Sequence, residues 1–86
     1  MRTGQWYLGC ITGDHFIVVP VVRQVNGSFK AIFYHFDRRR AVFGSTNYMH
    51  VPDMRETTPE EVLKQFGKTE GNKAVTRIQA RLGEVS

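Results

Sequence analysis

The chain has 86 residues, with 12 Lys and Arg against 8 Asp and Glu, a formal net charge of +4 and one cysteine. This length predicts a single domain, 1–86, and the lone cysteine excludes a fold held by an internal disulfide. No apolar run approaches the roughly 20 residues of a membrane-spanning helix, and residues 1–4 lead into a strand-like segment rather than a signal peptide. We therefore expect a cytoplasmic protein without a membrane partner, whose positive charge favours acidic ligands.

The first predicted strand covers residues 5–11, with Trp6, Leu8 and Cys10 on one face, and a turn at 12–14 follows it. Cys10 lies among apolar neighbours, where a buried structural thiol is commoner than a reactive one. A nucleophilic thiol also needs a base beside it, and the spacing brings no histidine to Cys10. We expect no catalytic role for this cysteine.

A β-hairpin comes next. Two runs rich in apolar, β-branched and aromatic residues, 16–25 and 28–36, flank Asn26-Gly27. Asn-Gly predicts a two-residue type I′ loop because both residues tolerate positive φ. Pro20 removes a backbone donor from the first run, so that strand is expected to bend, bulge or lie at an edge there.

The two-residue loop sets the register of the hairpin, with Arg23 opposite Lys30 and Val19 opposite Tyr34. Side-chain alternation then makes both faces apolar. One face carries Ile17, Val19, Val21, Ile32, Tyr34 and Phe36, and the other carries Phe16, Val18, Pro20, Val22, Ala31 and Phe33. A half-solvated sheet would show one polar face. Three alternatives remain: both faces are covered, the sheet curls toward a small barrel, or one face contacts a partner.

Residues 1–51 are predicted to complete an antiparallel sheet of four or five strands. After the hairpin, residues 37–40 form a charged turn, 41–43 a short strand, and 48–51 one more strand that ends at Pro52.

Residues 58–82 are predicted to form two short C-terminal helices packed on one face of the sheet, which makes the fold class α+β. The first begins at a capping box with proline at the first helical position, 58–61, and ends at Gly67. The second follows Gly71-Asn72 and ends at Gly83. Their buried faces are expected to carry Val62, Leu63, Phe66, Val75, Ile78 and Leu82.

Basic side chains gather in three parts of this predicted fold: the charged turn, one face of the second helix, where they recur every four residues, and the hairpin. Arginines in a turn can contact phosphates bidentately, and a neighbouring aromatic residue on the sheet resembles the way in which bases stack on protein surfaces. The candidate binding residues are Arg38, Arg39, Arg40, Lys30, Arg23, Tyr34, Lys73, Arg77 and Arg81.

The sequence thus predicts a small, basic, non-enzymatic module that binds nucleic acid, RNA or DNA, through the Arg-rich turn and the basic helix face. No catalytic constellation, zinc-ligand spacing or glycine-rich phosphate loop is visible, so no metal or cofactor is expected. The same basic residues are also typical of an ordinary solvated surface.

The alternative is a protein-binding inhibitor or adaptor of the phage or mobile-element type, acting through its apolar sheet face or a sheet edge. A homodimer through the sheet would also cover a hairpin that is apolar on both faces, and it would pair the basic surfaces symmetrically.

Overall fold

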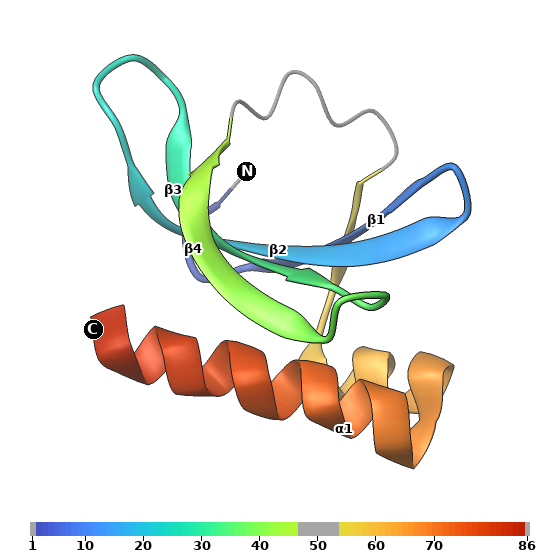
Figure 1. Ribbon diagram of the computed structural model, residues 1–86. Coiled ribbons are helices and arrows are strands. Elements are labelled where there is room, and N and C mark those ends of the chain that lie inside the picture. Colours follow the sequence, from blue (N-terminus) through green and yellow to red (C-terminus); the bar gives the residue numbers. More distant parts are fainter. Residues whose placement is uncertain (1, 47–53, 86) are drawn as a thin grey trace.

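Figure 1 shows the computed structural model, which describes residues 2–46 and 54–85. The strands form a sheet, and the helix lies across one side of it. In chain order the elements are β1 (Trp6–Ile11), β2 (Asp14–Arg23), β3 (Phe29–His35), β4 (Arg40–Thr46), β5 (Arg55–Thr57) and α1 (Pro59–Val85).

The five strands form one antiparallel sheet in the order β4-β3-β2-β1-β5, which confirms the predicted antiparallel α+β arrangement. β5 was not predicted, because its three residues are too short and too polar to produce a strand pattern. It follows the predicted sheet region 1–51 and pairs with β1. The strand predicted at 48–51 lies outside the described residues.

The type I′ geometry expected at Asn26-Gly27 is found at Thr12-Gly13. There both residues have positive φ, 49° and 85°, and Ile11 pairs with Asp14 directly across the turn.

At the second hairpin only Gly27 has positive φ, 87°, so the predicted type I′ loop is wrong. The Gly27 amide donates to the Gln24 carbonyl at 3.1 Å, and the Gln24 amide donates to the Ser28 carbonyl at 2.8 Å. The Asn26 side-chain oxygen accepts from the Ser28 amide at 3.1 Å. This is a turn followed by a left-handed glycine, in which the Asn26 side chain bonds its own loop instead of entering the left-handed region.

The longer loop changes the predicted register. Lys30 lies opposite Val22, and Arg23 lies opposite Phe29, so the predicted Arg23–Lys30 pair is wrong. The ladder shifts again between Pro20 and Val22, which confirms a bulge at the proline. Beyond the bulge the predicted partners are displaced by two residues, and a shift of two leaves each side chain on its predicted face.

Of the three alternatives left open for the two apolar faces, the structure shows buried residues at the centre of both. The larger cluster joins the sheet to α1 and contains Trp6, Leu8, Ile17, Val19, Ile32, Tyr34, Ala41, Val62, Ala74, Val75 and Ile78. The opposite face has a smaller cluster of Phe16, Val18 and Ala31, with Phe33 and Met54 packed against it. The helix therefore covers one face, and the residues at the centre of the other face are also withdrawn from solvent.

The prediction of two separate short helices is not matched, because one element, α1, runs from Pro59 to Val85, with a kink at Gly67 that joins two helical segments. One half of the predicted capping box is confirmed: the Glu61 amide donates to the Thr58 hydroxyl at 3.1 Å. Gly67, the predicted stop, has non-helical angles (φ 86°, ψ 177°), and helical geometry resumes directly after it. The helix is thus interrupted at the predicted residue, Gly67, and the two helical segments of α1 meet there at a kink.

Gly71, which reads in the sequence as part of a linker, is buried inside α1. A Cβ atom at this position would lie 2.8 Å from the Val62 carbonyl oxygen and 3.0 Å from the Leu63 Cα. The missing side chain therefore lets the part of α1 before the bend contact the part after it.

Candidate functional site

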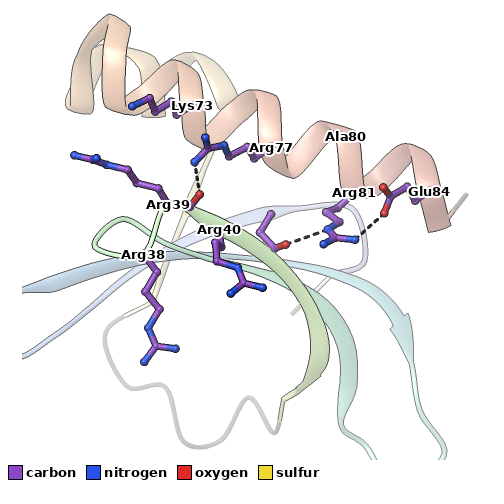
Figure 2. Close-up of a pocket in the computed structure, with 9 residues that line it drawn as sticks. Arg38, Arg39, Arg40, Lys73, Arg77, Ala80, Arg81 and Glu84 are labelled. Carbon is purple, nitrogen blue, oxygen red and sulfur yellow. Dashed lines mark hydrogen bonds and ion pairs between the residues drawn. The ribbon is translucent and has the colours of Figure 1, made fainter.

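The β3–β4 turn and the exposed side of α1 together border an open groove of about 640 Å³ (Figure 2). Six of its nine lining residues are cationic, and only one, Glu84, is acidic. The lining residues are Arg38, Arg39, Arg40, Ala41, Lys73, Arg77, Ala80, Arg81 and Glu84. The structure therefore brings together two predicted basic features that are more than 30 positions apart in the chain.

The turn that presents the three arginines is held by two backbone hydrogen bonds. The amides of Arg38 and Arg39 both donate to the His35 carbonyl, at 3.2 and 2.8 Å. Arg39 has a positive φ of 55°, in the left-handed region that disfavours any residue with a Cβ atom by about 1–2 kcal/mol. An arginine thus occupies a backbone position that suits glycine better.

Three of the six cations are tied to other groups. Arg77 on α1 donates to the Arg39 carbonyl oxygen, and Arg81 Nε donates to the Ala41 carbonyl oxygen at 3.0 Å. Arg81 also pairs with Glu84 at 2.9 Å, and the Arg39 guanidinium pairs with Glu70 at 3.2 Å. The hydrogen bonds from Arg77 and Arg81 join the helix to the turn and to the edge strand, so these two arginines help to position the groove.

The other three cations, Arg38, Arg40 and Lys73, have no hydrogen bond or ion pair from their side chains within residues 2–46 and 54–85. In Figure 2 the Arg38 and Arg40 side chains point away from α1, whereas Arg77 and Arg81 reach from α1 toward the turn and β4. The groove therefore combines arginines fixed by contacts with cations that are available to a ligand.

Tyr34 does not belong to this surface. Its side chain is fully buried, with an exposed fraction of 0%, and it packs edge-on against Phe36 with ring centroids 5.2 Å apart. Burial raises the pKa of its hydroxyl, while the nearby Arg77 guanidinium acts in the opposite direction. The prediction that Tyr34 offers a stacking platform is wrong, because the helix face of the sheet is the core.

Arg23 and Lys30 lie apart from the groove. They border a shallow hollow at the β2–β3 hairpin together with Val22, Gln24, Val25 and Asn26. Lys30 is five residues from the His35 end of β3, roughly 17 Å along the strand. The register shift also puts the Arg23 and Lys30 side chains on opposite faces of the ribbon. The predicted site residues are thus divided between the groove and the β2–β3 hairpin.

The β1–β2 ladder places Cys10 and His15 opposite each other, a pair that spacing along the chain did not indicate. Cys10 is exposed rather than buried, which corrects the expectation of a structural thiol, because it lies past the part of β1 that the core covers. Within the described residues no cluster of three or more His, Cys, Asp or Glu could hold a metal ion. None of the described helical segments is long and apolar enough to cross a membrane.

Four residues of the site were not predicted: Ala41, Ala80, Glu70 and Glu84. The two alanines line the groove with little bulk, and the two glutamates pair with its arginines. Helical spacing could have revealed Ala80 and Glu84, since they lie three residues from Arg77 and Arg81 respectively. The pairing of Glu70 with Arg39 joins distant parts of the chain and has no local signal.

We expect Arg39→Gly to leave the free energy of unfolding unchanged or to raise it by up to about 1 kcal/mol, since glycine removes the left-handed strain and the exposed Glu70 pair contributes less than that. Urea unfolding followed by circular dichroism measures this. Arg38→Gly, at a neighbouring turn position without positive φ, is the control and should lower stability. A loss of more than about 1 kcal/mol in Arg39→Gly would contradict the strain argument.

No protein-family model, curated protein or solved structure matches this chain, so its function is argued from the groove itself.

Proposed function

We propose that the protein is a small nucleic-acid-binding module whose basic groove contacts backbone phosphates. The single observation that carries the proposal is that six cationic residues of the β3–β4 turn and α1 border one open groove. Arginine and lysine are the usual phosphate ligands of nucleic-acid-binding proteins.

The composition of the groove favours a polyanion over a small molecule. Small-molecule pockets are lined mainly by apolar and aromatic side chains. Here the apolar residues at the groove, within the part of the chain that the structure describes, are Ala41 and Ala80. Arg38 and Arg40 point away from α1, while Arg77 and Arg81 point from α1 toward the sheet, so the charges are spread over a surface (Figure 2). A chain of phosphates can use charges spread in this way.

Fluorescence anisotropy with labelled nucleic acid over a series of salt concentrations tests the proposal. If three to six groove cations each contact one phosphate, log K should fall against log salt with a slope of roughly −3 to −5 on a duplex. Binding should remain measurable near physiological salt. The absence of binding to any nucleic acid at low salt would remove the proposal.

A protein partner is the second candidate, and a specific observation favours the sheet edge over the sheet face. β4 is an edge of the described sheet, and it exposes 38% of Val42 and 42% of Phe43. Exposed edge strands can pair with another chain. Light scattering at high protein concentration tests self-association, and a strictly monomeric mass would dispose of the homodimer.

A further inference from the structure

Among residues 2–46 and 54–85, no side chain that lines the groove offers a ring on which a nucleic-acid base can stack. Its lining consists of six cations, two alanines and one glutamate. Proteins that bind single strands combine a positive groove with exposed aromatic rings, and each stacked base contributes substantially to affinity. The described lining of this groove is positively charged but contains no aromatic ring.

The two aromatic residues that precede the Arg-rich turn, Tyr34 and Phe36, pack in or against the core. Tyr34 is fully buried. Phe36, the residue after β3, stacks on Phe66 of α1 with ring centroids 4.1 Å apart and an angle of 24° between the rings. Both phenylalanines pack against the core cluster and are only partly exposed. Among the described aromatic residues, Phe43 on β4 has a large exposed area, with 42% of its surface accessible. It does not line the groove.

The cations themselves are partly immobilised. The hydrogen bonds from Arg77 to the Arg39 carbonyl and from Arg81 to the Ala41 carbonyl fix two guanidinium groups between helix and sheet. A fixed array of charges binds best to phosphates that are already ordered, because no ordering entropy is then lost by the ligand. A duplex supplies ordered phosphates, whereas a flexible single strand must be ordered on binding.

A duplex also has the higher charge density and releases more counterions per phosphate contact than a single strand. For the function proposed above, on which this inference rests, we infer that the ligand of the groove is double-stranded nucleic acid bound through its phosphate backbone. The small side chains of Ala41 and Ala80 leave room for that backbone to approach the fixed arginines.

Anisotropy with a labelled duplex and with each of its separated strands, at a low and at a near-physiological salt concentration, tests the inference. The duplex should bind at least about fivefold more tightly than either strand. A ratio below this value, or a preference for a single strand, would overturn the inference and leave the proposed function standing. Failure to bind either form at low salt would instead remove the proposed function itself.

Phe43→Ala supplies a second measurement that does not depend on this ratio. Phe43 is the exposed ring onto which a single strand could extend from the groove, and its truncation should change duplex affinity by less than about twofold. A loss of about fivefold or more would show that a base stacks there and would contradict backbone binding to a duplex. Circular dichroism of the variant checks that it remains folded.

Discussion

The double charge reversal Arg38→Glu with Arg40→Glu is expected to weaken nucleic-acid binding by at least about a hundredfold at moderate salt. Both side chains border the groove and have no ion pair or hydrogen bond within the described part of the chain. The change removes two phosphate contacts and places two carboxylates against the phosphates. The salt slope should become shallower by about two units, since each lost contact removes about 0.9.

The matched control is Lys64→Glu with Lys68→Glu. It changes the net charge equally, and both lysines are exposed on α1 away from the groove lining. We expect a loss of affinity of less than about fivefold for this variant, through the long-range field alone. If both double variants lose affinity to the same extent, net charge rather than the groove determines binding.

Thermal unfolding serves as the second control for the reversals. Arg38 and Arg40 are exposed, and their side chains bond nothing within residues 2–46 and 54–85, so we expect the midpoint of unfolding to change little. Arg81→Ala, in contrast, should lower the midpoint of unfolding. It removes the bond to the Ala41 carbonyl and with it a connection between α1 and the edge strand β4. Thermal unfolding therefore distinguishes Arg38 and Arg40, which are expected to contact only the ligand, from Arg81, which also stabilises the fold.

Ile78→Ala is expected to lower the free energy of unfolding by about 2–5 kcal/mol. Ile78 is fully buried in the cluster that joins α1 to the sheet, and its truncation leaves a cavity there. A chain of this length is stable by only about 4–13 kcal/mol, so the loss is a large fraction of the total. Urea denaturation followed by circular dichroism measures it.

Leu63→Ala on the same helix is the matched control for this truncation. Leu63 keeps 38% of its area exposed, although the sequence predicts it on the buried side. Its truncation should cost less than about 1.5 kcal/mol because less surface returns to water and no enclosed cavity forms. Equal losses for the two variants would contradict the description of Ile78 as the anchor of α1.

The local part of the fold could be predicted because short-range patterns determine it. Alternation of apolar residues located β1 to β3 and assigned the core side chains of β2 and β3 beyond the bulge to their faces, and the bulge at Pro20 follows from its missing amide donor. The helix start at Thr58 follows equally from the capping box. Charge spacing every four residues placed Lys73, Arg77 and Arg81 on one side of the helix.

Local patterns failed where contacts distant in sequence outweigh propensity. Gly71-Asn72 reads as a linker between two helices, but the chain is helical there; the break lies earlier, at Gly67, and Gly71 then packs against Val62. At the β2–β3 loop the Asn26 side-chain bonds to Ser28 selected a longer turn and moved the register. Hydrophobicity alone could not decide whether Tyr34 would lie in the core or on the surface.

By itself, the sequence determined the antiparallel sheet, the apolar character of both its faces, the start of the helix and two separate sets of basic residues. Only the tertiary structure decided that the sets meet, because α1 crosses the face of the sheet next to β4, where Arg77 bonds the β3–β4 turn and Arg81 bonds β4. The same packing buried Tyr34 and left Arg23 and Lys30 on a different surface. Spacing along the chain reports which residues share an element, whereas the docking of one element on another depends on burial of the whole apolar surface.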